Sequence, residues 1–149
     1  MQGLTGADVD RAYLQGVISL NMSILALSDA AAVHLGTTTL QDFATNSIAD
    51  SRSNISKAQG WLRTKFCLDT TACMPSLSPG FDICNTDRPG KAFDDDYKNQ
   101  LVQYYLDEIA LSQVELERGL DSQVKAFAWQ TIKDDQTRIS KLRRCGVCI

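Results

Sequence analysis

The sequence has 149 residues, of which 44% are hydrophobic, and its formal net charge is −3. This length and apolar content are sufficient for one domain with a buried core, and they exclude an intrinsically disordered chain. The acidic balance argues against a nucleic-acid partner, because phosphate binding requires a basic face.

Two helices are predicted in the first part of the chain, over about 7–33 and 39–65. In each, apolar residues recur at steps of three and four, which is typical of a helix with one buried face. The first series is Val9, Tyr13, Val17, Leu20, Ile24, Leu27 and Ala31, and the second begins at Leu40. Gly36 and Thr37 between them predict a helix stop followed by an N-cap.

Residues 66–93 differ from these helices in composition. They contain Pro75, Pro79, Pro89, Gly80, Gly90, Cys67, Cys73 and Cys84. Prolines and glycines at this density predict a long connector rather than a helix. A connector of this length is unusual in a compact domain, and disulfides would hold it in place.

Two further helices are predicted over about 94–118 and 122–144. Asp94 opens the first of them, with two more aspartates whose negative charges suit the positive end of a helix dipole. Gly119 and Asp121 repeat the stop-and-cap pattern. A short tail, 145–149, contains Cys145 and Cys148.

The two halves are copies of one helical hairpin. A shift of 84 positions aligns them without a gap, with twelve identities between Asp10, which meets Asp94, and Lys57, which meets Lys141. Because one hairpin cannot bury its own apolar stripe, the two must pack together. We therefore predict an all-α protein, a four-helix bundle in a single domain over 1–149. It consists of repeat one (about 7–65), the connector (about 66–93), repeat two (about 94–144) and the tail.

Each half resembles the ferritin-like domain of unknown function 305, and the resemblance covers about four-fifths of the chain. The first half carries an Asp and an aromatic residue near its start, Asp10 and Tyr13, and later the series Ile24-Leu25-Ala26-Leu27-Ser28. In that family a Met-Ile-x-His-His box and further Met residues lie on the same helices. Some members are exported copper-binding proteins, for which these His and Met residues are the natural ligands.

The sequence departs from the family at every ligand position. The His-His box is replaced by Leu20 and Asn21 in one half and by Tyr104 and Tyr105 in the other. The Met positions hold Leu27, Leu111, Ala58 and Leu142. A soft copper site requires thioether and imidazole ligands, so the resemblance implies the fold without the family's copper site.

Carboxylates offer a second route to a metal centre. Glu108 and Glu115 share a predicted helix face with Leu101, Tyr104 and Leu111. Ferritin-like bundles hold metals with interior carboxylates, usually together with a Glu-x-x-His motif, which this sequence lacks. We therefore expect the third helix to be rotated, so that it buries Val102, Tyr105, Ile109 and Leu116 instead. A buried Asp135 near Glu108 would favour a metal site.

The five cysteines, Cys67, Cys73, Cys84, Cys145 and Cys148, lie outside the regular helical segments. This placement favours disulfides in a secreted protein, and their odd number leaves one for another chain. The alternative is a copper or zinc site formed by Cys67, Cys73, Cys145 and Cys148, if the ends of the second and fourth helices lie near each other.

Localisation follows from the cysteines more than from the N-terminus. The first ten residues lack the basic and apolar regions of a signal peptide, which fits a cytoplasmic protein or one whose leader has been removed. No apolar run reaches the ~20 residues of a membrane span, so we expect none. Candidate glycosylation sequons at Asn21 and Asn54 are compatible with the secreted or extracellular location that the cysteines favour.

We expect a non-catalytic structural or interaction protein with no cofactor. The single histidine, His34, leaves no partner for a His-based catalytic centre. Self-association would use the odd cysteine or the aromatic residues Tyr104, Tyr105 and Trp129. The alternative function is copper or zinc binding by the cysteines.

Overall fold

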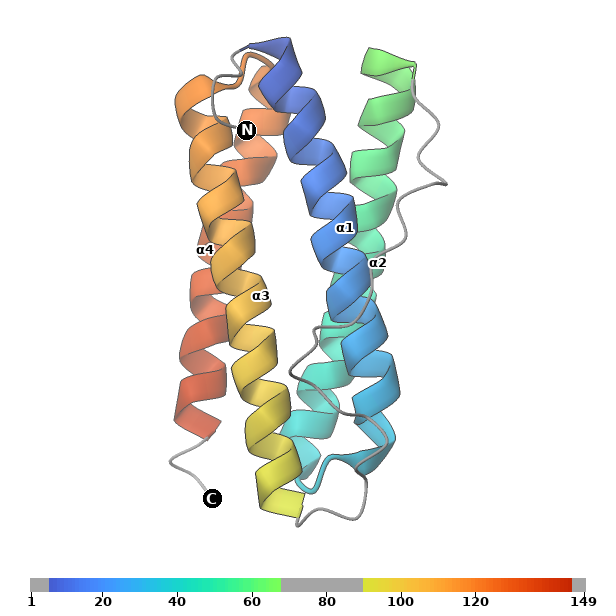
Figure 1. Cartoon of the computed structure of the whole chain (residues 1–149), viewed down its shortest axis with the longest axis vertical. Helices are drawn as coiled ribbons and strands as arrows, with labels where there is room; N and C mark the ends of the chain where they lie inside the picture. The colour runs from blue at the N-terminus through green and yellow to red at the C-terminus, as the bar shows by residue number, and fades with distance from the viewer. Residues whose placement is uncertain (1–5, 68–89, 146–149) are drawn as a thin grey trace.

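The structure, a computed structural model, describes residues 6–67 and 90–145. These residues form four α-helices: α1 (Ala7–Ala31), α2 (Thr38–Phe66), α3 (Gly90–Arg118) and α4 (Ser122–Cys145), with a 3-10 turn, η1 (Ala32–His34), after α1. Figure 1 shows them side by side in a bundle, in which α2 and α3 run in the same direction. One long crossover between two antiparallel hairpins is the ferritin-like arrangement. The prediction of an all-α four-helix bundle is confirmed.

The helix starts follow from local capping. The side chain of Thr37 accepts a hydrogen bond from the backbone N–H of Leu40 at 3.3 Å, which satisfies a donor that the first turn of α2 leaves free. Asp121 does the same for Val124 at the start of α4, at 3.1 Å. Both caps lie where the sequence predicts them.

Helix α3 begins four residues earlier than predicted, at Gly90 instead of 94. The reason is the role of Asp94, which is 2% exposed and accepts a hydrogen bond from the backbone N–H of Gly36 at 2.8 Å. Asp94 therefore holds the α1–α2 loop from within α3 and does not cap its own helix. Its repeat counterpart Asp10 accepts from Leu120 at 2.9 Å, in the α3–α4 loop. Each repeat thus holds the loop of the other.

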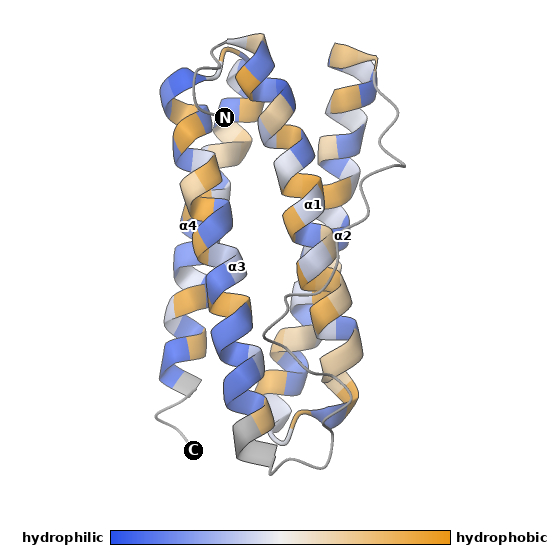
Figure 2. Cartoon of the chain, viewed as in Figure 1, coloured by the Kyte–Doolittle hydropathy of each residue, from blue (hydrophilic) through white to orange (hydrophobic). Residues whose placement is uncertain are grey.

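The core consists of two apolar clusters with a polar layer between them. The lower cluster in Figure 1 includes Ile24, Leu27, Leu40, Leu101 and Ile139, and the upper one includes Leu14, Val17, Leu62, Val124 and Ala128. On every helix, buried polar residues separate the two: Asn21 on α1, Ser51 on α2, Glu108 on α3 and Asp135 on α4. Polar positions therefore interrupt the apolar stripes of the helices, as the mixed colouring in Figure 2 shows.

The segment Ala7–His34, which comprises α1 and η1, has 28 residues and is the one segment in the described ranges that is apolar and long enough to cross a membrane by composition and length. This corrects the expectation that no run reaches that length. In the bundle, α1 is a core helix with twelve buried residues, and buried core helices satisfy the same criterion.

Candidate metal centre in the bundle interior

Helix α3 turns its carboxylates inward. Glu108 is 1% exposed and Glu115 is 0% exposed, whereas Val102, Ile109 and Leu116 are only partly buried. The predicted rotation of this helix is therefore wrong. That prediction assumed that carboxylates avoid the interior, but here each one meets a polar group on a neighbouring helix, which offsets part of the cost of burial.

Glu108 meets Asp135 at the level of the polar layer. Asp135 is 0% exposed, so both carboxyl groups are removed from water. Asn21 donates its amide N–H to Oε2 of Glu108, and Arg138 donates to Oδ1 of Asp135 at 2.7 Å. Apart from the contact between the two carboxyl groups themselves, no group in the described part of the chain donates a hydrogen bond to Oε1 of Glu108 or Oδ2 of Asp135. Glu108 and Asp135 are called the central pair below.

Electrostatics within the central pair favour a bound cation. Burial raises the pKa of Glu108 well above its usual range, and the negative charge of Asp135 and a hydrogen bond with Asp135 raise it further. Burial also raises the pKa of Asp135, although hydrogen bonds from Glu108 and Arg138 oppose this effect. Two facing carboxylates cannot both be ionised and unpartnered in a low dielectric. A proton shared by the two groups relieves this repulsion, and a bound cation in its place would do the same.

Neighbouring side chains fix the central pair in place. Arg138 donates to Oδ2 of Asp50 on α2 at 2.9 Å, and its guanidinium lies over the ring of Tyr105 at 5.7 Å. Asn54 donates to Oδ1 of Asn21 at 3.2 Å. All four helices thus contribute to the surroundings of the pair.

A second buried carboxylate lies seven residues along α3. Neither oxygen of Glu115 has a hydrogen-bond donor in the described ranges, and its side chain is next to Asp10. Burial, followed by a hydrogen bond with Asp10 and the charge of Asp10, raises the pKa of Glu115 to about 9. Glu115 is therefore protonated at neutral pH.

The donor set decides which metals fit the central pair. The two carboxylates supply oxygen ligands only, because Asn21 turns its N–H to Glu108 and its oxygen to Asn54. No group of three or more His, Cys, Asp or Glu that could hold a metal ion occurs in the described residues, so any further ligands would be solvent. Oxygen donors suit hard and borderline divalent ions, whereas Cu(I) and Ag(I) prefer sulfur. The pair fits a divalent ion such as Cu(II), and it does not fit Cu(I) or Ag(I).

The other predicted site residues lie apart from this centre. Tyr104 is 8% exposed and Tyr105 is 3% exposed, so their prediction as interaction residues is wrong, because both side chains belong to the lower apolar cluster. Trp129 is 51% exposed, with the Lys133 ammonium 3.9 Å from its ring centroid. It stays a candidate for an interaction.

Glycosylation of the two sequons is contradicted by their burial. Asn21 is 1% exposed and Asn54 is half-buried, and the two amides are hydrogen-bonded to each other. A glycan requires an acceptor on an exposed loop, whereas both residues lie within helices whose interior faces carry them.

Cys67 follows the last residue of α2 and Cys145 is the last residue of α4, at opposite ends of the bundle (Figure 1). The ion pair between Lys65 and Asp121, at 2.9 Å, places the end of α2 beside the start of α4. The 24 residues of α4 then span about 36 Å. The expectation that these helix ends meet is therefore wrong, and one site cannot contain both cysteines. Cys73, Cys84 and Cys148 lie outside the described residues.

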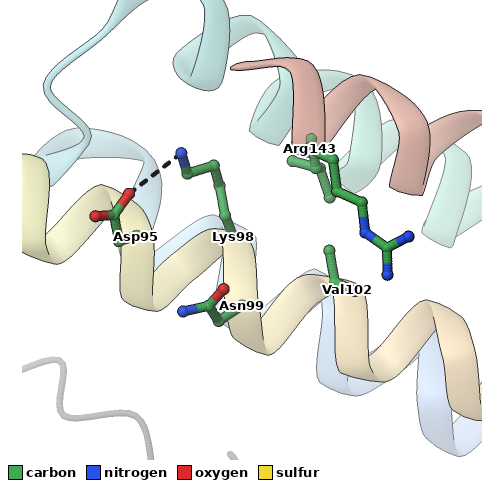
Figure 3. A pocket seen from close by; sticks show the side chains of 6 residues that line it. Asp95, Lys98, Asn99, Val102 and Arg143 are labelled. Atoms are coloured by element: carbon green, nitrogen blue, oxygen red, sulfur yellow. Dashed lines mark ion pairs between the residues drawn. The ribbon is translucent and has the colours of Figure 1, made fainter. Parts of the chain in front are cut away.

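A surface pocket near the start of α3 differs from the central pair (Figure 3). Its lining residues include Asp95, Lys98, Asn99, Val102 and Arg143. Lys98 pairs with Asp95 at 3.2 Å, and the buried atoms without hydrogen-bond partners in the described residues lie elsewhere. The pocket therefore lacks the feature that distinguishes the central pair.

Solved structures of one protein superpose on this chain over nearly its whole length. CopM in the Cu(II)-bound form matches with a TM-score of 0.78 and 14% identity, over 91% of this chain and 93% of that chain. The Cu(I)-bound form (TM-score 0.75, 13% identity) and the Ag-bound form obtained by co-crystallization (0.77, 12%) match over the same shares. This chain has the fold of CopM.

At these identities the likeness to CopM establishes the fold alone. No model of a known protein family matches the sequence, and no curated protein matches it. Membership of the domain of unknown function 305 therefore stays a prediction.

The comparison with CopM corrects the predicted function. The CopM structures that match were solved with copper or silver bound, which overturns the expected structural or interaction role without metal in favour of the metal-binding alternative, as a proposal for this chain. Of the ligands expected for that alternative, Cys67 and Cys145 lie at opposite ends of the bundle, and Cys73 and Cys148 lie outside the described residues.

Proposed function

We propose that this chain is a metal-binding protein that holds one divalent ion, Cu(II) in the first instance, at the central pair. The observation that supports this proposal is the contact between two buried carboxyl groups, Glu108 and Asp135, each with one oxygen that no other group in the described structure hydrogen-bonds. Copper is the first choice because CopM was solved with copper bound.

The free energy that the protein loses by burying two carboxylates in the polar layer also supports this proposal. A core with apolar residues in place of Glu108 and Asp135 would be at least as stable, since packed hydrophobic residues often match or exceed buried ionisable groups in their contribution to stability. A bound cation compensates the burial of both carboxylates at once. The repeat counterparts of these residues, Ile24 and Ser51, show that the fold accommodates uncharged residues at the same positions.

The proposal is tested by metal titration of the full chain with its cysteines blocked by alkylation. We expect one Cu(II) per chain, an electron paramagnetic resonance spectrum of oxygen-dominated coordination, and no comparable binding of Ag(I). Glu108→Gln and Asp135→Asn should each weaken Cu(II) binding by at least tenfold. The matched control is Glu117→Gln, which alters an exposed carboxylate on the same helix.

Two outcomes would overturn the proposal. In one, the alkylated chain binds no divalent ion although it is folded. In the other, binding is unaffected by both substitutions and disappears on alkylation, which would move the site to the cysteines.

A further inference from the structure

Arg138 separates the central pair from a surface pocket. The pocket, about 230 Å³ in volume, lies between α2 and α4, and its walls include Phe43, Ser47, Asp50 and Arg138. A water molecule occupies about 30 Å³ of liquid, so the pocket has room for an ion with several of its waters. One wall of this pocket is the side chain of Arg138, which contacts Asp135 of the central pair.

One guanidinium connects the interior with the surface. Arg138 donates from Nη1 to Asp135 at 2.7 Å and from Nη2 to Asp50 at 2.9 Å. The Asp135 side chain is 0% exposed, whereas the Asp50 side chain is 52% exposed. The Arg138 side chain is itself 19% exposed. Arg138 therefore has one buried partner, Asp135, and one partner at the surface, Asp50.

Charge balance sets Arg138 and a divalent ion in competition. A divalent ion at the central pair and the guanidinium of Arg138 would be two cations on the one carboxylate of Asp135. Like charges this close repel each other strongly in a low dielectric. A divalent ion at the central pair should therefore displace Arg138 from Asp135, and Asp50 provides the partner that keeps the guanidinium paired outside.

We propose that the pocket beside Asp50 is the route by which the metal ion reaches the central pair, and that Arg138 is the residue that closes this route. In the metal-free protein Arg138 is the internal counter-cation of Asp135. On loading it gives up Asp135 and is held by Asp50 at the pocket wall. This inference rests on the proposed function and adds the path and the residue that controls metal exchange.

The first test compares Cu(II) affinity and association rate, measured by stopped-flow with alkylated cysteines, in matched variants. Arg138→Met keeps the length of the side chain and removes its charge, so it should bind at least tenfold more tightly and associate faster. Asp50→Asn should weaken binding about threefold or more, because the displaced guanidinium loses its outer partner. Arg52→Met, an exposed change on the same helix as Asp50, should leave both quantities unchanged.

The second test uses the wild-type chain, because Arg138→Met also removes the partner of Asp135 and can impair folding. Arginine side-chain nuclear magnetic resonance should show a shifted Arg138 Nε–H signal with faster solvent exchange after addition of Cu(II) or diamagnetic Zn(II). An unchanged signal on loading, or unchanged affinity in a folded Arg138→Met variant, would overturn the route while the proposed function stands. Absence of binding to the wild type would instead overturn the proposed function.

Discussion

The Tyr13 hydroxyl on α1 hydrogen-bonds to the Ser112 hydroxyl on α3 at 2.9 Å, inside the bundle. The same contact occurs a second time with the repeats exchanged, because Tyr97 on α3 bonds to Ser28 on α1 at 2.6 Å. Each member of one pair lies 84 positions from its counterpart in the other. Two equivalent bonds thus link the repeats on either side of the polar layer.

The two tyrosine bonds predict equal and additive effects. Tyr13→Phe and Tyr97→Phe should each lower the free energy of unfolding by about 1 kcal/mol, since each leaves a buried serine without its partner. The double variant should show the sum, because the sites are distant and share no partner. Chemical denaturation measures all three, and Tyr13→Phe made in a Ser112→Ala background should cost much less. A full cost in that background would show that the bond is not the cause.

Asp94→Ala should be one of the more costly polar substitutions. It removes the buried, charged acceptor of the Gly36 N–H and leaves the α1–α2 loop unsupported, at a cost of about 1.5–3 kcal/mol. The neighbouring Asp95→Ala is the control, because it removes only a half-exposed pair with Lys98, worth about 0.5 kcal/mol or less. Similar losses from both substitutions, measured by urea denaturation, would contradict the loop-holding role of Asp94.

Glu115 predicts a dependence of stability on pH. Its folded-state pKa, about 9, lies above the ordinary value of 4.5, so the folded chain holds a proton that the unfolded chain releases. This contribution to stability is complete below about pH 4.5 and is lost as the pH rises towards 9. Glu115→Gln, which mimics the protonated form, should be more stable than the wild type at pH 9 and similar at pH 5. Parallel pH profiles of the two proteins would contradict this prediction.

Alanine substitutions at two glycines should have opposite effects on the stability of the protein. A Cβ at Gly60, inside α2, meets no atom within 4 Å, so Gly60→Ala should stabilise the protein by about 0.5–1 kcal/mol through helix propensity. A Cβ at Gly119 would overlap the side chain and the backbone oxygen of Glu115, and the backbone cannot easily yield. Gly119→Ala should therefore lower the melting temperature while Gly60→Ala raises it. A change of the same sign in both variants would contradict the packing described for the α3–α4 loop.

Much of the fold could be predicted from local sequence signals. The three-and-four spacing of apolar residues and the caps at Thr37 and Asp121 gave helix positions close to those observed, since such signals act within a few residues. The repeat offset predicted that two hairpins pack together. The start of α3 was misplaced because Asp94 satisfies a loop in the other repeat, a contact that no local pattern contains.

The candidate site was harder to predict for the same physical reason. Glu108 and Asp135 are acceptable in the interior only because each contacts the other and because Asn21 and Arg138 lie beside them. Arg138 follows Asp135 by three residues on α4, but the other contacts join three helices and are distant in sequence. The one available signal was that Glu108 and Glu115 share a helix face with Leu101 and Leu111, and the general preference of carboxylates for water outweighed it.

The loop contacts of Asp10 and Asp94 describe a two-fold relationship within one polypeptide. A single hairpin would lack a carboxylate for its own loop and a cover for its apolar face, and a second copy related by a two-fold axis would supply both. The present chain is therefore equivalent to a fused symmetric dimer, in which association no longer depends on concentration. Fusion also allows the halves to differ. In a dimer of identical hairpins, any substitution would appear twice, whereas here Glu108 stands opposite Ile24 and Asp135 opposite Ser51, so the interior can hold one asymmetric carboxylate pair.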